Sequence, residues 1–558
     1  MPTFTYDKKD LLQLIGKKLS DRELEKIINS IKPEVEWITK KEITIEHTPD
    51  RPDMFGIEGL ARSIKYYLGI YKKIRKSKLL KPKVSVKVEK VKIRPFVGCA
   101  VVRNVKLNDR FIRSLMHIQD ALTDTLGRKR KKVSIGIHDL DKIHFPVIYT
   151  SVPPTEKMIP LGGNYEMSLK EILEKEEKGR EYGYIIKNSK KWPVFLDKRG
   201  IISFPPILNS ERTKVTKNTK NLFLELTGLD ERTLNQCLNI LVTNFTERGC
   251  KIEKVIIDYP SRKITLPKLE EEKVRVEIEL IGNLIGIELP GKEIIRILRK
   301  MGFDGKLKGK YVEVKIPPYR ADILHKVDIV EDIAIGYGIE NLEPQIPNLQ
   351  TVGKIHPLEK FSSRMRVLMV GLGMEEIMRP ILSSKEKQFD KMKIKPKNWI
   401  EIENPVSREY SIPRVWLLPS LLEFLSLNQN VEYPQKIFEI GDVIIRDEKN
   451  ETRTRNFKKI AGAIANSKVN YEEILAIVDS IFSALKFSYK IKKTEHPSFI
   501  EGRVANILVE NKKVGILGEI HPEILRNWNL EMPTVAFELD LEFLYKLSTK
   551  PTSYPFKK

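Results

Sequence analysis

A chain of 558 residues cannot bury its apolar side chains in a single hydrophobic core, because single cores stop growing beyond roughly 250–300 residues. We therefore expect roughly three to five domains of ordinary size. Hydrophobic residues form 41% of the sequence and charged residues 31%, which is typical of a folded, soluble protein. The sequence thus predicts several separate cores.

Two simple patterns exclude other classes of protein. No stretch approaches the roughly 18 uncharged apolar residues of a membrane span, and the amino-terminal residues MPTFTYDKKD lack the apolar core of a signal peptide. Cys99, Cys237 and Cys250 are scattered and form no C-x-x-C motif, so neither a disulfide framework nor a zinc cluster is expected. The predicted location is a reducing cytoplasm, with no membrane partner.

The charge balance favours an anionic partner. Lys and Arg number 99 against 75 Asp and Glu, which gives a net charge of +24. Such a chain attracts polyanions, and a nucleic acid is the expected one. A surface that is simply rich in lysine is the alternative. No phosphate-binding loop of the Walker type and no G-x-G-x-x-G motif is present.

The pattern of apolar residues divides the chain into four predicted domains: 1–83, 84–265, 266–346 and 347–558. In the first, helical spacings run through residues 10–31 with a break at Gly16. A proline-bounded turn then precedes a helix, and a basic stretch leads into an alternating strand.

Each of the other three segments mixes strands and helices, as an α+β protein does. We expect strands at 96–107, 181–187 and 194–207 and a helix at 111–127 in the second segment, strands at 273–287 and 310–317 around a short helix in the third, and antiparallel strands interleaved with helices after a helix near 356–371 in the last.

Four carboxylates stand close together near the end of the third segment. Asp328, Glu331 and Asp332 have the spacing i, i+3, i+4 and so share one helix face, and Asp322 precedes them after a Pro-Pro-Tyr-Arg turn. Like charges at this spacing cost roughly 0.2–0.5 kcal/mol per pair. Three explanations remain open: a solvated first turn that complements the helix dipole, a Mg²⁺ ion, or a basic patch on a partner.

Several motifs resemble one family along essentially the whole chain. VKIPPYRADILHKVDIVEDIAIGYG resembles the B5 module of the phenylalanine–tRNA ligase β subunit family, and EHTPDRPDMFGIEGLAR resembles that family's amino-terminal signature. IGIHDLDKI, FPPILNSERTKVT and LFLELTGLD resemble its editing domain in the archaeal and eukaryotic version. ENPVSREYSIPR, LLPSLL, KIFEIGDV and LGEIHPEIL resemble its catalytic-like carboxyl-terminal domain.

The resemblance implies a multidomain α+β fold. It comprises an N-terminal α/β domain, a B3/B4-type editing domain, a B5 module and an antiparallel domain like the catalytic domain of class II synthetases. A separate α subunit, expected in an α₂β₂ heterotetramer, would use ATP to attach phenylalanine to tRNA(Phe). This chain would support that reaction and hydrolyse mischarged Tyr-tRNA(Phe). A tRNA-binding scaffold without editing is the alternative.

The same resemblance assigns Mg²⁺ to Asp322, Asp328, Glu331 and Asp332. It places an editing pocket at four polar residues, Ser203, Asn209, Glu225 and Thr227. Glu225 would read the tyrosine hydroxyl, Thr227 would line the pocket, and Ser203 and Asn209 would orient the ester or a water. Related sequences tend to carry Asp in place of Glu225. Composition alone favours turn-capping roles for these residues.

The last segment lacks the residues that adenylate chemistry requires. Class II synthetases hold ATP with arginines, because developing phosphoryl charge needs fixed cations. The corresponding strand reads Phe438-Glu439 with no preceding Arg, and Gly515 and Gly518 do not lead into a Gly-rich run that ends in Arg. His356, His496 and His521 each precede a proline and are expected to cap turns. We expect a structural copy of the catalytic domain.

One basic run is the local candidate for contact with tRNA phosphates. It comprises five consecutive cations, Arg128, Lys129, Arg130, Lys131 and Lys132. Phosphate contacts by such residues release counterions and make binding depend on salt. A solvated loop is the alternative.

Overall fold

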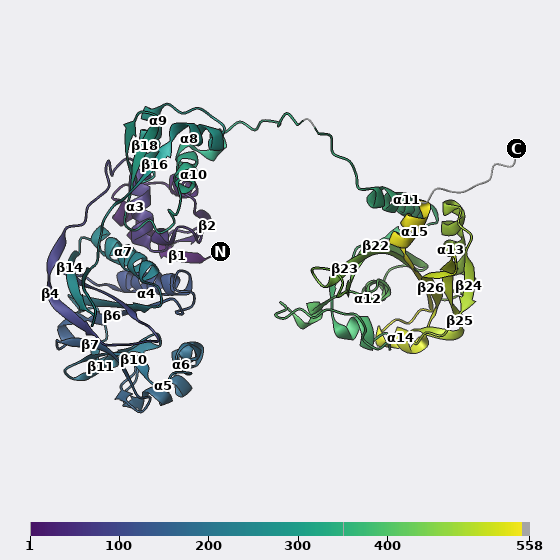
Figure 1. Cartoon of the computed structure of the whole chain (residues 1–558), viewed down its shortest axis with the longest axis horizontal. Coiled ribbons are helices and arrows are strands. Elements are labelled where there is room, and N and C mark those ends of the chain that lie inside the picture. Colours follow the sequence, from purple (N-terminus) through teal and green to yellow (C-terminus); the bar gives the residue numbers. More distant parts are fainter. Residues whose placement is uncertain (1, 350, 550–558) are drawn as a thin grey trace. The chain divides into compact units, whose positions relative to one another are not determined.

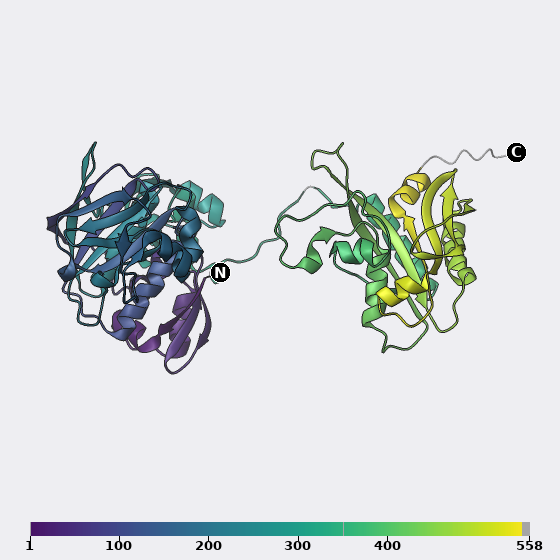
Figure 2. The same cartoon turned by 90° about the horizontal axis from the view of Figure 1, so that it is seen from below.

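The computed structural model describes residues 2–349 and 351–549. It comprises two compact units, Met1–Ile346 and Pro347–Lys558, and the last residues of the second lie outside the described part (Figures 1 and 2). Within the first unit, elements of the three predicted domains pack on one another, whereas the second unit is built around one sheet.

The chain begins with a small α/β layer. Its sheet has the order β1-β3-β2, and its helices cover one side. The expected helix break is confirmed, because Gly16 adopts a left-handed φ of 75° and closes the first helix. The elements are β1 Thr3–Asp7, α1 Lys8–Ile15, α2 Asp21–Asn29, β2 Glu34–Ile38, β3 Glu42–Glu46 and α3 Ile57–Tyr67.

A ten-stranded sheet forms the centre of the first unit. Its strand order is β12-β11-β10-β7-β4-β14-β5-β13-β6, with β15 paired to β14. Helices α4 and α7 supply apolar residues to the same core. The strands are β4 Leu79–Val88, β5 Phe96–Arg103, β6 Val133–Asp139, β7 Val147–Val152, β10 Trp192–Asp197, β11 Gly200–Phe204, β12 Leu208–Asn209, β13 Leu222–Gly228, β14 Lys251–Asp258 and β15 Lys263–Leu266, and the helices are α4 Asp109–Asp124 and α7 Glu231–Glu247.

The two ends of this sheet lie against each other. Strands β12 and β11 stand at one end of the strand order, whereas β13 and β6 stand at the other. Asn209 on β12 nevertheless donates a hydrogen bond from Nδ2 to the carbonyl of Ile137 on β6, over 3.1 Å. Ser203 on β11 likewise donates to Glu225 on β13. The sheet therefore curls, and its closure places polar residues from distant strands together.

A small hairpin with two helices packs against strands β10 and β11 of the sheet. It contains β8 Lys157–Met158, β9 Met167–Ser168, α5 Leu169–Lys175 and α6 Glu177–Tyr182. The expected strand at 181–187 is wrong: α6 continues into a 3₁₀ helix at Gly183–Ile185. Tyr182 and Ile186 are the buried apolar side chains there, whereas Tyr184 between them is 43% exposed. A strand would place all three on one face, so the pattern is that of a helix.

The third segment folds as a three-stranded sheet with helices. The sheet order is β16-β18-β17. Of the expected strand at 273–287 only the first part is correct, because helix α8 starts at Ile278. Ile278, Ile281 and Ile285 have helical spacing. The elements are β16 Glu272–Glu277, α8 Ile278–Ile285, α9 Gly291–Lys300, β17 Asp304–Lys308, β18 Tyr311–Ile316 and α10 Lys326–Tyr337.

The second unit is a seven-stranded sheet between two helical layers. The order is β19-β22-β23-β27-β26-β25-β24, antiparallel except at β19, which confirms the expected antiparallel domain. Helices α11, α13 and α15 belong to one apolar core and α12 and α14 to another. The bounds are α11 Pro357–Gly371, β19 Glu375–Glu376, β20 Leu382–Ser383, β21 Ile412–Pro413, α12 Leu418–Leu427, β22 Gln435–Arg446, β23 Thr454–Ala465, α13 Tyr471–Leu485, β24 Lys490–Lys493, β25 Phe499–Val509, β26 Lys512–Ile520, α14 Pro522–Asn527, β27 Thr534–Asp540 and α15 Leu541–Ser548.

The histidines of this unit cap turns and helices, as predicted. The imidazole of His356 accepts a hydrogen bond from the backbone of Leu358 at the start of α11. His521 does the same at the start of α14, and His496 accepts from the backbone of Ser498. Among the described residues, no helix is long and apolar enough to span a bilayer.

Candidate active site

A cavity of about 470 Å³ opens where the curled sheet closes. Its wall is mostly apolar, and three of the four predicted pocket residues line it: Ser203, Asn209 and Glu225. The apolar wall comes from α4 and the surrounding strands and loops, and includes Ile112, Leu115, Ile135, Ile137, Pro206, Leu208 and Val215. An apolar cavity with a few converging polar groups is the usual form of a small-ligand site.

Glu225 lies in the centre of strand β13 and is 2% exposed. It stands directly opposite Gly136 on β6, where a Cβ atom would lie only 2.2 Å from the Glu225 Oε1 atom. Glycine at this position therefore makes room for the carboxylate. The Ser203 hydroxyl donates a hydrogen bond of 2.6 Å to the same Oε1 atom. Because Gly136 has no side chain, the strand pair has room for Glu225, which is longer than the Asp of related sequences.

Ser203 and Asn209 form a cross-strand pair on β11 and β12. The Ser203 hydroxyl lies 3.4 Å from Asn209 Oδ1, and Asn209 Nδ2 is held by the carbonyl of Ile137. Ser203 is 1% exposed. The two side chains are thus fixed against Glu225, so the cluster is organised before any ligand enters.

Thr227 is fully buried and is not among the residues that line the cavity in the described chain. It stands opposite Ser134 on β6, and the two hydroxyls lie 3.0 Å apart. Ser134 does line the cavity. Thr227 therefore contacts the pocket through its neighbour.

Arg94 is a buried residue that sequence reasoning missed. Its guanidinium donates to the hydroxyl and carbonyl of Thr227, to the Ser134 hydroxyl, and to the carbonyls of Arg130 and Lys131. Burial lowers the pKa of Arg94 to about 10. Because all five bonds go to neutral groups, no pattern of opposite charges in the sequence marks this residue.

His138 was also missed. It stands opposite Phe223 on the same face of the sheet as Glu225, and its Nδ1 atom lies 2.8 Å from the Thr213 hydroxyl. Its buried Nε2 atom lies 3.7 Å from Glu225 Oε1 and has no hydrogen-bond partner among the described residues. The alternation of β6 places Ser134, Gly136 and His138 on one face, and this was the available signal.

The basic run lies beside the cavity as a tight turn. Arg128, Lys129 and Arg130 all have left-handed φ angles, of 49°, 51° and 62°. Arg130 lines the cavity and donates to the carbonyls of Pro206 and Ile207.

The cations of this run differ in their availability for a ligand. Lys132 is paired with Asp230 at 3.1 Å. Arg128, Lys129 and Lys131 are exposed and have no ion pair within the described chain. These three cations, rather than all five, remain available for a phosphate.

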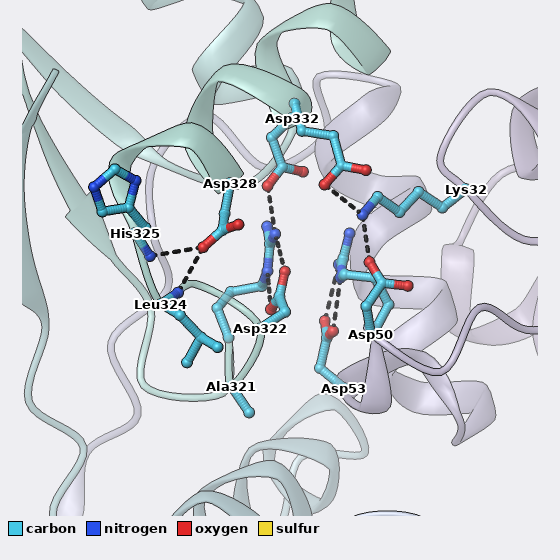
Figure 3. A network of polar contacts seen from close by, with 12 residues as sticks. Lys32, Asp50, Asp53, Ala321, Asp322, Leu324, His325, Asp328 and Asp332 are labelled. Carbon is cyan, nitrogen blue, oxygen red and sulfur yellow. Dashed lines mark hydrogen bonds and ion pairs between the residues drawn. The ribbon is translucent and has the colours of Figure 1, made fainter. Parts of the chain in front are cut away.

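Each of the four clustered carboxylates has a protein partner; Figure 3 shows the surroundings of Asp322, Asp328 and Asp332. Asp322 and Asp332 both accept hydrogen bonds from the Arg320 guanidinium. Asp328 accepts from the backbone N–H groups of Leu324 and His325 and thereby caps α10. Glu331 pairs with Lys32 of the first segment at 3.0 Å, and Lys32 also binds Asp50.

The pKa values of Asp322 and Asp332 shift in opposite directions. Burial alone would raise the pKa of Asp322, but Arg320 outweighs burial and lowers this pKa to about 2. Burial of Asp332 outweighs the same guanidinium and raises the pKa of that carboxyl. The guanidinium thus supplies the positive charge that these two groups require.

The fit of a Mg²⁺ ion can be judged from these contacts. In the described ranges, no three His, Cys, Asp or Glu side chains converge as a metal site. Arg320 lies between Asp322 and Asp332, and both N–H partners of Asp328 point at one oxygen. Mg²⁺ requires near-octahedral oxygen ligands at 2.0–2.1 Å. In this arrangement the four residues do not fit a shared ion, and their role as ligands stays a prediction.

In the second unit, the buried Arg414 contacts β22, the strand that carries Phe438-Glu439. Arg414 Nη1 lies 2.7 Å from Glu439 Oε1, and its other bonds go to the carbonyls of Asp442 and Arg379. Arg379 itself pairs with Glu423 at 2.9 Å. Both guanidinium groups thus contact protein acceptors, and the loss of adenylate chemistry stays a prediction.

Comparison with known proteins matches three family models along the chain. Residues 85–257 match the B3/4 domain, residues 274–339 the tRNA synthetase B5 domain, and residues 342–541 the phenylalanyl tRNA synthetase beta chain CLM domain. The cavity and its polar cluster fall within the first of these matches.

Curated relatives resemble the chain over nearly all of its length. The phenylalanine–tRNA ligase beta subunit of Pyrococcus furiosus is 42% identical over 98% of this chain and 100% of its own. That of Thermococcus kodakarensis is 40% identical, over 99% of this chain and 100% of its own.

A solved structure is also similar. The crystal structure of an N-terminal fragment of the phenylalanyl-tRNA synthetase beta subunit from Pyrococcus horikoshii shares 39% identity, with a TM-score of 0.59, over 60% of this chain and 100% of the fragment. These matches in sequence and structure agree with the motifs and the antiparallel second unit. The chain belongs to the family of phenylalanine–tRNA ligase beta subunits.

Proposed function

We propose that this chain is the β subunit of a phenylalanine–tRNA ligase that proofreads its product. An α subunit uses ATP to attach phenylalanine to tRNA(Phe), and this chain supports that reaction and hydrolyses Tyr-tRNA(Phe). The observation that carries the editing role is the cluster of buried Ser203 and Glu225 with half-buried Asn209 in a mostly apolar cavity of the B3/4 match.

The cluster is suited to distinguish tyrosine from phenylalanine. An apolar pocket rejects an added hydroxyl only weakly, by about 10²-fold, so a synthetic site alone admits some tyrosine. A phenol that enters this cavity can donate a hydrogen bond to Glu225, whereas a phenyl ring leaves the buried carboxylate without that donor. Ser203 already donates to Glu225, so the phenol adds a second donor. A hydrogen bond to a charged group contributes about 1.5–3 kcal/mol. Glu225 therefore favours tyrosine as the group to be removed.

The residues around Glu225 position the ligand, whereas Glu225 recognises the tyrosine hydroxyl. Ser203 and Asn209 are fixed at the seam between β11, β12 and β6, from which they can orient the ester or a water. Thr227 supports the wall through Ser134. The exposed cations Arg128, Lys129 and Lys131 lie on the turn beside the cavity and are suited to contact RNA phosphate.

Replacing Glu225 with alanine tests this proposal. In the assembled ligase, we expect Glu225→Ala to slow deacylation of Tyr-tRNA(Phe) by about 10- to 100-fold, which corresponds to the loss of one buried hydrogen bond to a charged group. The rate at which phenylalanine is attached should stay near that of the wild type. Release of labelled tyrosine from preformed Tyr-tRNA(Phe) measures the first rate.

The matched control is Glu174→Ala, because Glu174 is an exposed glutamate of the same sheet domain. Equal deacylation by wild type and Glu225→Ala would remove Glu225 from the site. A wild-type complex that binds tRNA(Phe) without any hydrolysis would instead support the non-editing scaffold.

The second unit offers a surface for the α subunit. Val367 and Val370 lie three residues apart on α11 and are 74% and 59% exposed, and Met378 beyond it is 91% exposed. Val367 and Val370 share one face of α11, and contiguous exposed apolar patches mark protein–protein contact sites, so we propose this face as the contact. An α₂β₂ assembly and the cytoplasm remain the predicted state and location, with ATP used at the α subunit.

A further inference from the structure

A second cavity in the first unit is rich in positive charge. It measures about 340 Å³, at the small end of ligand sites. It is formed by α3 and the stretch that follows it, by the end of α7, and by Tyr319. Five cations line it against a single carboxylate, Glu247: Arg62, Arg75, Lys76, Lys78 and Lys251.

The single carboxylate is already neutralised. Glu247 Oε2 lies 3.2 Å from Lys65 Nζ and accepts a hydrogen bond of 2.9 Å from the Tyr71 hydroxyl. Within the described chain, Lys78 and Lys251 have no ion pair, and Arg75 donates to the Tyr71 hydroxyl rather than to an acid. Arg75, Lys78 and Lys251 therefore lack compensating charge, whereas Lys76 pairs with Glu271 at 3.6 Å and Arg62 with Asp53 at 3.8 Å.

Arg62 provides the buried end of the cavity. Its side chain is 2% exposed and lies 3.8 Å from the Tyr319 ring centroid. Its Nη1 atom donates to the Asn244 side chain, and its Nη2 atom donates to the Asp53 carbonyl and lies 3.8 Å from the Asp53 carboxylate. Its buried Nε atom has no hydrogen-bond partner among the described residues. An unsatisfied buried N–H of a guanidinium is costly unless an acceptor reaches it.

We propose that this cavity binds a phosphodiester group of an RNA backbone. A phosphate oxygen can accept from the unused N–H of Arg62, since guanidinium groups recognise phosphates through directed hydrogen bonds. The exposed side chains of Arg75, Lys78 and Lys251 stand at the rim, where they can contact neighbouring phosphates of a polymer. The choice of RNA over a free phosphate rests on the proposed function, which brings a tRNA to this chain.

Charge removal at the rim tests the site without disturbing the buried residues. Lys78→Gln with Lys251→Gln alters two exposed side chains, so folding stability should change by less than about 0.5 kcal/mol each. In the assembled ligase, we expect this double variant to lower the slope of log affinity against log salt for tRNA(Phe) by about 2, because each lysine–phosphate contact contributes about 0.9. Filter binding across a salt series measures this slope.

Lys83→Gln with Lys87→Gln is the matched control, since both lysines are exposed on β4 and do not line the cavity. This control should keep the wild-type slope. An equal fall in both double variants would show a general charge effect and overturn the site, as would an unchanged slope in the Lys78 and Lys251 variant.

Calorimetry with inorganic phosphate separates the two sources of the anion. Phosphate binding that is lost in the Lys78 and Lys251 variant, together with an unchanged tRNA slope, would assign the cavity to a free phosphate and overturn the RNA assignment. Deacylation of Tyr-tRNA(Phe) by the same variants is measured in parallel at low salt. Its persistence would leave the proposed function standing even if the cavity takes no RNA.

Discussion

At the scale of single residues, the editing site depends on side chains that hold other side chains. Gly136 leaves the space that the Glu225 carboxylate occupies. Arg94 binds Thr227, Ser134 and the carbonyls of the basic turn. One buried guanidinium thus fixes both the wall of the cavity and the turn that supplies Arg130 to it.

Replacing Arg94 with methionine should destabilise the chain. The substitution keeps the approximate volume but leaves buried carbonyl and hydroxyl groups without donors, each worth about 1–3 kcal/mol and not strictly additive. We expect a loss of roughly 2–4 kcal/mol in the free energy of unfolding, measured by urea denaturation. Arg199→Met, at an exposed arginine of the same sheet domain, should change stability by less than about 0.5 kcal/mol. Equal stability of the two variants would contradict this role.

Sequence reasoning reached some of these residues and missed others for physical reasons. Ser203, Asn209 and Glu225 were predicted through motif resemblance, because their local composition equally suits turns. Their convergence depends on the two ends of a sheet meeting, and no local pattern encodes contacts between strands so far apart in the chain. Arg94 bonds to neutral groups, and the one carboxylate near His138, Glu225, lies on another strand, so no local charge pattern revealed either residue.

At the scale of elements, the three acidic residues of helix α10 each have a different structural role. Asp328 caps the helix, Glu331 reaches Lys32 in the first segment, and Asp332 faces inward to Arg320. The i, i+3, i+4 spacing correctly predicted a shared helix face. It could not predict the partners, because Lys32 and Arg320 come from outside the helix.

Metal removal distinguishes these partners from a bound ion. Because Arg320 already neutralises Asp322 and Asp332, we expect the thermal midpoint of the isolated chain to be the same in excess EDTA and in excess Mg²⁺. Arg320→Gln should instead cost about 3–5 kcal/mol, since it leaves buried carboxylates unpaired. A midpoint that falls in EDTA and rises again with added Mg²⁺ would show that the carboxylates hold an ion.

At the scale of the whole molecule, the fold divides the labour of the ligase. The first unit carries a mostly apolar cavity with a polar cluster. The second unit keeps the antiparallel architecture that the sequence predicted, yet Arg414 and Arg379 are engaged with protein groups. Periodicity and motifs were sufficient for this architecture because its strands are long and regular. We therefore expect proofreading in this chain and amino-acid activation in its partner subunit.

Phenylalanine-dependent exchange of pyrophosphate into ATP tests this division most directly. Since adenylate formation requires cations free to bind the phosphates, the purified chain alone should give no exchange above background, and addition of the α subunit should restore it. Exchange by the purified chain without the α subunit would contradict the account.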